Sequence, residues 1–545
     1  MRRKRLRSTL LGKYLRRRLA FFRLVVIVVV GGVLFQIFRF VVLRPEPYRS
    51  MAEKQHFIEV KVSGKRGTIY DRRGRPLAFS GEGITLEIID TISRADSVKL
   101  ARWGINVNRF AIHKRITGIS PTLWDSLKSI RGIFRTLRQN RRYYPCGEAC
   151  ANIVGKVRGI HGVSGIEYGY DSILAPRYVV KRYLKDASGR VYPMPVSLAT
   201  AIRQLLFGSD VADGKDLHTT LDMDLQRLTH HLLKERVREV GAKGGMVIVA
   251  DAKTGDILTF SAVGSLRRNH IFNYEPGSNF KVVVYTEGFE RGITPQDTCG
   301  ISDGVLRLGR GVVIRDIKPL GEKNTWYWAL VKSSNACAAK LALRMDSIRR
   351  NGLYRRALLY GFGEPANIGL PEDPIRFEKP SQWRMWRKVK IANMAIGQGI
   401  FVNAIQMLRA YITIANDGRF IFPKLVQGPV RYYEIRTVAD KGTFKILKDL
   451  LVGVVDSGTG RWARIEGVKV AGKTGTAQKY DPRRGKYSLN RSLTSFIGFF
   501  PAYDPDYVIY VLIDEPTKAL TGGTAAAPLF RRIAKGILKI DSLRN

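Results

Sequence analysis

The longest apolar stretch of the chain lies close to its N-terminus. Residues 19–43 are apolar apart from Arg23, Gln36 and Arg39, and the segment 24–35 contains no polar side chain. A helix of this length spans roughly 37 Å at ~1.5 Å per residue, which is enough to cross the core of a membrane. The pattern predicts one transmembrane helix over 19–43, and no second apolar stretch of this length follows.

Helical and strand periodicities become clear after residue 217. Leu225 and Leu233 fall on one face of a predicted helix that Asp222 can cap. Residues 246–260 alternate as two strands around a Thr-Gly turn, and residues 495–513 predict a second hairpin that turns at Asp-Pro-Asp. The two hairpins lie near opposite ends of one long segment.

An amphipathic helix is predicted over 525–540, and mostly helical patterns fill the space between the hairpins. Strands at both ends with helices between predict one α/β domain, in which the C-terminal strands complete the sheet and helices cover both of its faces.

The same patterns divide the chain into four parts. Residues 1–18 form a basic tail, 19–43 the transmembrane helix, 44–216 a first domain and 217–545 the α/β domain. The region 44–216 mixes short apolar alternations with basic loops and holds no set of catalytic residue types. It is interpreted as a support or interaction module.

The charge of the chain is unusual and bears on its location. It contains 92 Lys and Arg against 46 Asp and Glu, a formal net charge of +46. Nine basic residues and no acidic one precede residue 19, which predicts a cytoplasmic N-terminus and export of everything after residue 43. Export argues against a nucleic-acid partner and favours anionic lipid or wall polymers as the surroundings. A cleaved signal peptide is disfavoured because residues 44–55 offer no small-residue cleavage site.

Four cysteines, Cys146, Cys150, Cys299 and Cys337, leave two possibilities open. Outside the cytoplasm they can form disulfides, and free buried thiols explain them equally well. The spacing of His and Cys residues around them does not match a zinc site.

The first candidate motif is Ser278 with Lys281, and a scan of every serine finds no other Ser-x-x-Lys in the chain. On a helix these positions share a face, so the amine can lie within hydrogen-bond range of the hydroxyl. A lysine whose pKa is lowered by burial can act as the base that a serine nucleophile needs. Alone, the motif is equally typical of a helix N-cap beside an exposed lysine.

The second candidate is Ser333 with Asn335, a hydroxyl and an amide that together can relay a proton and hold a peptide. The same spacing recurs at 488–490, in an Arg-rich loop that is interpreted as a solvated turn.

The third candidate is Lys473-Thr474-Gly475-Thr476, which follows a strand-like alternation. Lysine and threonine side chains on a strand can bind a carboxylate. The glycine permits close backbone approach, and the Thr476 N–H can face an oxyanion. Lys-Thr-Gly also occurs at 253–255, at a predicted hairpin tip, so this tripeptide alone is equally typical of a turn.

Each motif alone is common, but the three in this order are typical of serine acyl-transfer enzymes. The chain resembles the class B penicillin-binding proteins over nearly its whole length. The similarity includes KRGTIYDRRGRPLA at 65–78, GVSGIEYGYDSIL at 162–174, and MAIGQG at 394–399. EPGS before Ser278 and the Ser-x-Asn form resemble the septal, FtsI-type branch. Asn279, Asn403 and Ala404 depart from the usual pattern without touching the chemistry.

This resemblance implies a fold and a reaction. The fold would be a mixed α+β pedestal of the dimerisation type, then a penicillin-binding/β-lactamase-like domain with an antiparallel sheet covered by helices. The reaction would be peptidoglycan D,D-transpeptidation, with Ser278 acylated by a D-Ala-D-Ala stem peptide. Lys281 would be the base, Ser333 would carry the proton to the leaving amine, and Asn335 would hold the substrate and the lysine.

By the same resemblance, Lys473 and Thr474 would bind the terminal carboxylate of the substrate or of a β-lactam inhibitor. The backbone N–H groups of Ser278 and Thr476 would form the oxyanion hole, and no metal or organic cofactor is expected. The expected setting is the bacterial inner membrane, beside a SEDS-type glycosyltransferase and other division proteins.

Three alternatives remain. An elongation-type class B transpeptidase would carry the same motifs, and so would a catalytically idle division scaffold. A hydrolase of the β-lactamase type is disfavoured because no Glu-x-x-Leu-Asn segment supplies its deacylating glutamate.

Overall fold

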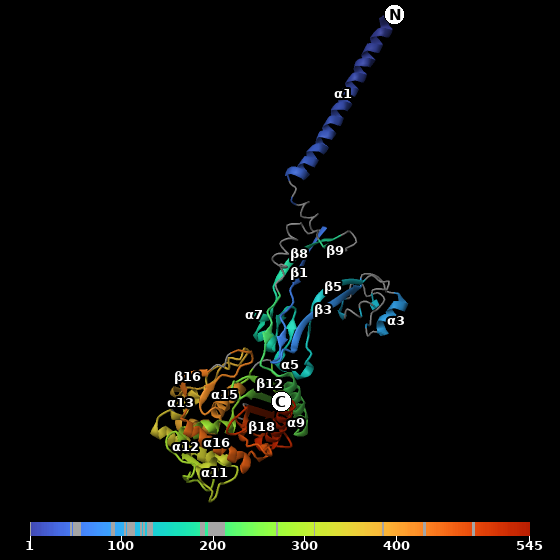
Figure 1. The fold of residues 1–545 in the computed structure, drawn as a ribbon. Coiled ribbons are helices and arrows are strands. Elements are labelled where there is room, and N and C mark those ends of the chain that lie inside the picture. The colour runs from blue at the N-terminus through green and yellow to red at the C-terminus, as the bar shows by residue number, and fades with distance from the viewer. Residues whose placement is uncertain are drawn as a thin grey trace. The chain divides into compact units, whose positions relative to one another are not determined.

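The computed structural model shows two compact units (Figure 1). One contains Met1–Gly64 and Arg177–Ala212, and the other contains Lys65–Pro176 and Asp213–Asn545. Each unit is described by itself. The structure describes residues 2–43, 46, 56–88, 93–102, 105, 115–119, 123, 126–127, 134–185, 191–193, 213–268, 271–309, 311–383, 386–428, 432–481 and 485–544.

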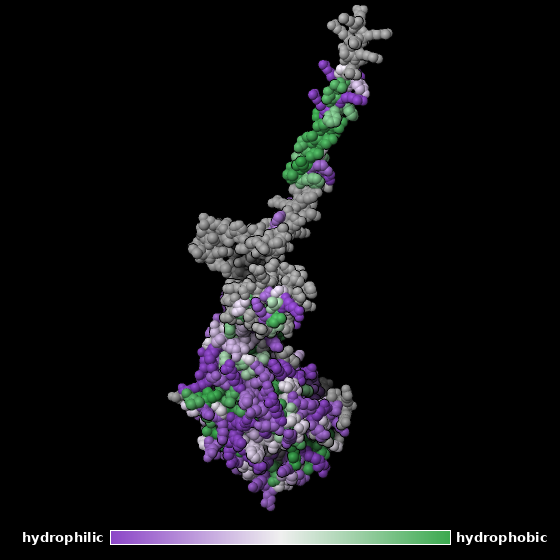
Figure 2. Space-filling view, turned by 90° about the vertical axis from the view of Figure 1, so that its right-hand side faces the viewer, coloured by the Kyte–Doolittle hydropathy of each residue, from purple (hydrophilic) through white to green (hydrophobic). Residues whose placement is uncertain are grey.

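The first unit holds the apolar N-terminal helix. Helix α1 (Arg2–Phe38) continues into a π-helical turn, η1 (Arg39–Leu43). In the described part of the chain, one helix is long and apolar enough to cross a membrane, over Tyr14–Val42. Its apolar side chains are exposed, and Figure 2 shows them gathered along α1. Such a surface is stable only in apolar surroundings.

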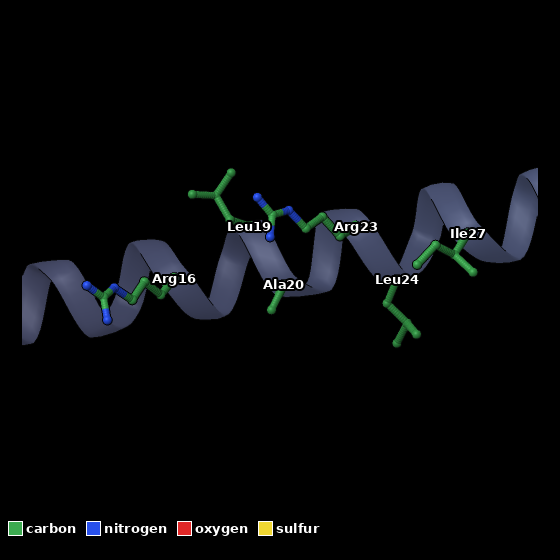
Figure 3. A pocket seen from close by; sticks show the side chains of 6 residues that line it. All are labelled: Arg16, Leu19, Ala20, Arg23, Leu24 and Ile27. Atoms are coloured by element: carbon green, nitrogen blue, oxygen red, sulfur yellow. The ribbon is translucent and has the colours of Figure 1, made fainter.

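Arginine occurs inside this span, and its placement explains why it is tolerated. Arg16 and Arg23 are seven residues apart, so they project from the same helix face with Ala20 between them (Figure 3). Leu19, Leu24 and Ile27 complete this face. Near the end of a span, arginine side chains can reach the lipid head groups while their stems stay among the lipid chains.

The same unit contains a small antiparallel sheet. Its strands pair in the order β1 (Phe57–Ser63), β8 (Tyr178–Lys185) and β9 (Val191–Pro193).

The second unit begins with a mixed sheet. Its strands are β2 (Ile69–Tyr70), β3 (Pro76–Ile88), β4 (Arg115–Ile119), β5 (Phe134–Tyr143) and β10 (Leu217–His218). Arg66, from the predicted motif at 65–78, donates to Glu167, from the motif at 162–174, at 2.6 Å. Arg142 of β5 binds the other oxygen of Glu167 at 2.7 Å. These side chains are buried, so the two distant motifs join in one ion-pair network.

A five-stranded antiparallel sheet forms the centre of the larger part. The order is β12 (Ile257–Gly264), β11 (Gly244–Asp251), β19 (Tyr507–Asp514), β18 (Lys486–Phe500) and β17 (Ala471–Asp481). The hairpins predicted at 246–260 and 495–513 are β11–β12 and β18–β19. Strand β17, which carries the third motif, is an edge strand of this sheet.

Helices cover both faces of the sheet, as predicted (Figure 1). Val247 and Val249 of β11 pack in a core with α9 (Met223–Glu239) and α18 (Ala527–Ser542). Met246 and Ile248 point to the other face. They pack in a core shared with α10 (Lys281–Phe289), α11 (Trp326–Val331), α12 (Asn335–Ile348), α13 (Gly352–Leu359), α14 (Arg387–Ala395), α15 (Ala404–Ala415) and α16 (Lys441–Asp456). The predicted α/β class is confirmed.

All four cysteines are paired in the structure, as Cys146–Cys150 and Cys299–Cys337. Of the two possibilities that the sequence leaves open, the structure has the disulfides.

Candidate active site

The turn that carries Ser278 is held against the third motif. Residues Gly277–Phe280 form a 3-10 turn, η3, directly before α10. The Gly277 N–H donates to the Gly397 carbonyl at 3.0 Å. Gly277 has φ 56°, and a Cβ atom there would come within 2.9 Å of the Thr476 carbonyl oxygen. Only glycine combines this conformation with such a close approach, so the local sequence places the partly exposed Ser278 beside β17.

Lys281 begins α10 and is fully buried. Its amine donates to the Ser333 carbonyl at 2.6 Å, to Asn335 Oδ1 at 2.7 Å and to Ser333 Oγ at 3.2 Å. A lysine ammonium has three donors, and all three serve the second motif. Among the described residues, no hydrogen bond joins Lys281 to the Ser278 hydroxyl, although the helical spacing predicts one. Catalytic hydrogen bonds often close only when substrate is bound.

The second motif lies on a strained turn at the start of α12. Ser333 has φ 63°, the left-handed region that a non-glycine residue rarely adopts. Ser334 caps α12 by accepting from the Cys337 N–H at 3.0 Å, and Asn335 is the first helical residue. The strain directs both the carbonyl and the hydroxyl of Ser333 toward Lys281, and such outliers persist where surrounding contacts enforce them.

Asp316 supplies those contacts, and sequence reasoning missed it. This carboxylate follows β14 (Val312–Arg315), the second strand of a short hairpin with β13 (Val305–Gly309). One oxygen accepts from the Asn335 N–H at 2.5 Å and from the Ala336 N–H at 2.9 Å. The other accepts from the Ser334 hydroxyl at 2.6 Å. The available sequence signal was an acidic residue among the cations of VIRDIKPLGEK.

The third motif joins the second through a shared hydroxyl. Lys473 is fully buried, and its amine donates to Ser333 Oγ at 2.8 Å. Thr474 Oγ1 lies 2.7 Å from Thr459 Oγ1. Thr476 Oγ1 accepts from the Gly522 N–H at 3.3 Å. Gly475 leaves room for Asn279, because a Cβ there would come 2.8 Å from the amide nitrogen of that side chain.

The two amines share one hydroxyl, and their electrostatics follow from burial. Burial lowers the pKa of Lys281 to about 7, although the negative charge of Asp316 acts in the opposite direction. Burial, with a further contribution from the charge of Lys281, holds the pKa of Lys473 well below its usual range. Two buried cations this close disfavour each other. The two amines are therefore not both charged at neutral pH, and a neutral form of Lys281 is accessible there.

The two look-alike segments lie in other surroundings. Lys253 binds Asp506 at 2.9 Å, which joins the tips of the two hairpins. Ser488 lies in strand β18, so the interpretation of 488–490 as a loop turn is wrong, and its hydroxyl accepts from the Arg491 N–H at 3.2 Å. In the described ranges, neither contacts the three motifs. No group of three or more His, Cys, Asp or Glu residues is placed to hold a metal ion among the residues that the structure describes.

Comparison with known families agrees with this geometry. Residues 245–535 match the family described as the penicillin binding protein transpeptidase domain. The chain belongs to this family. It is 31% identical to penicillin-binding protein PbpB of Mycolicibacterium smegmatis over 443 residues, which are 74% of this chain and 65% of that protein. It is 28% identical to peptidoglycan D,D-transpeptidase FtsI of Escherichia coli, with 88% of this chain and 84% of that protein covered.

Solved penicillin-binding proteins share the fold. The apo form of penicillin binding protein 3 from Mycobacterium tuberculosis superposes with a TM-score of 0.66 at 25% identity, covering 89% of this chain and 97% of that chain. Penicillin binding protein 2X from Streptococcus thermophilus gives a TM-score of 0.70 at 21% identity, covering 89% and 81%. The predicted resemblance to class B penicillin-binding proteins is confirmed.

Proposed function

We propose that this protein is a peptidoglycan D,D-transpeptidase that cross-links stem peptides through an acyl-enzyme on Ser278. The observation that carries the proposal is the convergence of the motifs on one hydroxyl. Ser333 Oγ lies 3.2 Å from the Lys281 amine and 2.8 Å from the Lys473 amine, and the Ser278 turn packs on β17. Membership of the transpeptidase family supports it.

In the acylation step, neutral Lys281 takes the Ser278 proton as the oxygen attacks the carbonyl of the penultimate D-Ala. The negative charge that develops on the carbonyl oxygen is stabilised by the N–H groups of Ser278 and Thr476. Asn335 keeps the substrate and the lysine in place. Ser333 then passes its proton to the leaving nitrogen and takes the proton held by Lys281, so both groups return to their starting forms. The peptide bond breaks, and the terminal D-Ala departs as a free amine.

Lys473 and Thr474 orient the substrate by binding its terminal carboxylate. Thr459 supports Thr474 through their contact at 2.7 Å. In the second step an amine of a neighbouring stem peptide attacks the ester carbonyl. The new amide is the cross-link, the amine loses its proton to the base, and Ser278 regains its hydroxyl.

A β-lactam would follow the same first step. Ser278 would open the lactam ring, and because the leaving nitrogen stays attached to the acyl group, the ester would persist. The β-lactam carboxylate would take the place of the substrate carboxylate at Lys473 and Thr474. A penicillin is therefore a direct probe of the nucleophile.

The resemblance to FtsI-type proteins supports a septal role and a location at the bacterial inner membrane. We place residues 1–18 in the cytoplasm, the helix over 19–43 in the membrane, and the pedestal (44–216) and transpeptidase domain (217–545) outside, because the basic residues precede the span. A SEDS-type glycosyltransferase and other division proteins are the proposed partners.

A fluorescent penicillin tests the nucleophile. The full-length protein in detergent should be labelled covalently, Ser278→Ala should lose all label, and the control Ser488→Ala, in the look-alike segment, should keep it. An unlabelled wild type would instead support the idle scaffold. Incubation with stem-peptide substrate and mass spectrometry separates transfer from hydrolysis, because only a transpeptidase gives the cross-linked dimer.

A further inference from the structure

The Cys299–Cys337 disulfide lies next to the second motif. Cys337 is on the first turn of α12, two residues after Asn335, and its N–H donates to the capping hydroxyl of Ser334 at 3.0 Å. Both sulfur-bearing side chains are buried. The disulfide therefore holds the end of α12 that presents Asn335 to Lys281.

The other half of the disulfide is attached to a separate, well-anchored segment. The Cys299 N–H donates to the Asn324 carbonyl at 2.7 Å. Next to it, Thr298 forms a β-bridge with Thr325, whose hydroxyl caps α11. The start of α12 is thus bonded covalently to a segment that is itself hydrogen-bonded to the residues just before α11.

The loop that this disulfide closes contains much of the support of the second motif. It spans 38 residues and includes the β13–β14 hairpin, Asp316 and Ser333. Closing a loop limits the arrangements open to the chain within it, most of all in the unfolded state. The Cys146–Cys150 disulfide closes only 4 residues and lies outside this loop, so it provides a natural comparison.

We infer that the Cys299–Cys337 disulfide is a positioning element of the active site, which keeps Ser333 and Asn335 against the amine of Lys281. This inference rests on the proposed function. Without the disulfide, we expect the start of α12, then held only by non-covalent contacts such as those of Asp316, to move more readily and to admit water to the amine. The titratable groups that face Lys281 are Asp316 and Lys473. Hydration relieves the burial that holds the pKa of Lys281 to about 7, so the pKa rises and less of the base is neutral at pH 7.

The test compares Cys299→Ala/Cys337→Ala with the control Cys146→Ala/Cys150→Ala, both in the full-length protein. The rate constant of acylation by a fluorescent penicillin is measured from pH 5.5 to 9, together with the melting temperature. If the pKa of Lys281 rises by about one unit, the acylation rate of the first variant should be about fivefold lower at pH 7. The pH midpoint of its acylation should be about one unit higher than that of wild type. The control should keep the wild-type rate and midpoint.

A lower melting temperature with an unmoved midpoint would overturn the inference, because it would leave the disulfide a purely structural role. Equal changes in both variants would overturn it as well. If the first variant does not fold, folded wild-type protein reduced with a phosphine replaces it. Alkylation and mass spectrometry then confirm free thiols at 299 and 337. The midpoint of acylation and the melting temperature again decide the result. An unlabelled wild type would refute the proposed function, a result distinct from an unmoved midpoint.

Discussion

At the scale of single residues, the proposed role of Lys281 as base predicts how the reaction depends on pH. Only the neutral amine accepts a proton, so acylation should rise as the pH rises through the pKa of about 7 that burial produces. The second-order rate constant with a penicillin should increase roughly tenfold per pH unit below 6 and level off above 8. Lys473 shares the hydroxyl partner, so the measured midpoint belongs to the pair.

The control for this profile is Lys234→Gln, a lysine on α9 whose exposed amine binds Glu148 at 2.8 Å. It should leave the midpoint unchanged. A flat profile, or a midpoint near the ordinary pKa of lysine, would contradict a role for Lys281 as base.

Asp316 changes the pKa of the same amine in the direction opposite to burial. Its charge raises the pKa of Lys281 against the effect of burial. Asp316→Asn keeps an oxygen for the N–H groups of α12 but removes the charge, so the midpoint of acylation should fall by roughly half a pH unit. Asp316→Ala also removes the acceptor of the Asn335 and Ala336 N–H groups, which should cost about 1 kcal/mol of stability and slow acylation.

Asp303→Asn is the matched control, because Asp303 lies just before the same hairpin and accepts from the Val305 N–H at 3.0 Å. It should change neither the midpoint nor the rate. A midpoint that stays in place, or rises, in Asp316→Asn would show that Asp316 serves only as a helix cap. Denaturant unfolding beside the pH profile separates the two roles.

At the scale of elements, η3 depends on the absence of a side chain at Gly277. Gly277→Ala would bring a Cβ within 2.9 Å of the Thr476 carbonyl, in a left-handed backbone conformation. Backbone oxygen cannot swing aside, so η3 must separate from β17. We expect acylation to fall at least tenfold and stability to fall by about 2 kcal/mol.

Gly292→Ala isolates the effect of the left-handed backbone conformation from that of the clash. Gly292 has φ 79° and no atom within 4 Å of its would-be Cβ. It shares the backbone penalty, about 1 kcal/mol, without the clash. Thermal unfolding and penicillin labelling of both variants should therefore separate strain from displacement. Equal labelling rates in the two variants would contradict the proposed packing of η3 on β17.

The elements also differ in how well the sequence predicts them. The β11–β12 and β18–β19 hairpins and helix α9 are predicted because burial and local turn or cap signals agree, as at Asp222, which caps α9. The β13–β14 hairpin is not predicted from the sequence, because its strands are short and half-exposed. The role of Asp316 arises from contact with Asn335, 19 residues later, and an acidic residue among cations does not by itself indicate that contact.

The site itself shows the same limit. Ser278, Ser333 and Lys473 were identified from motif order, and Lys473 does contact Ser333. Helical spacing predicted a Lys281–Ser278 hydrogen bond, whereas the packing of α10 on α12 directs the amine to Ser333 and Asn335. The left-handed turn at Ser333, which a serine rarely adopts, depends on these tertiary contacts.

At the scale of the whole molecule, the distribution of charge predicts which side of the membrane each part occupies. Nine basic residues precede the apolar span, and cationic segments next to a span are retained in the cytoplasm. A fusion of alkaline phosphatase after Asn545 should therefore be active, because this enzyme folds only outside the cytoplasm. A green fluorescent protein at the same point should stay dark if exported in unfolded form.

The matched control changes charge without changing hydropathy in the span. Replacing the basic residues of 1–18 with glutamine should reduce phosphatase activity several-fold, because retention of the tail is then lost. Replacing the five basic residues within 531–544, far along the exported part, should leave it unchanged, because distant charges do not set orientation. Phosphatase activity that is absent in the wild-type fusion would place the transpeptidase domain on the cytoplasmic side, where its peptidoglycan substrate is not cross-linked, and the proposed function would fail with it.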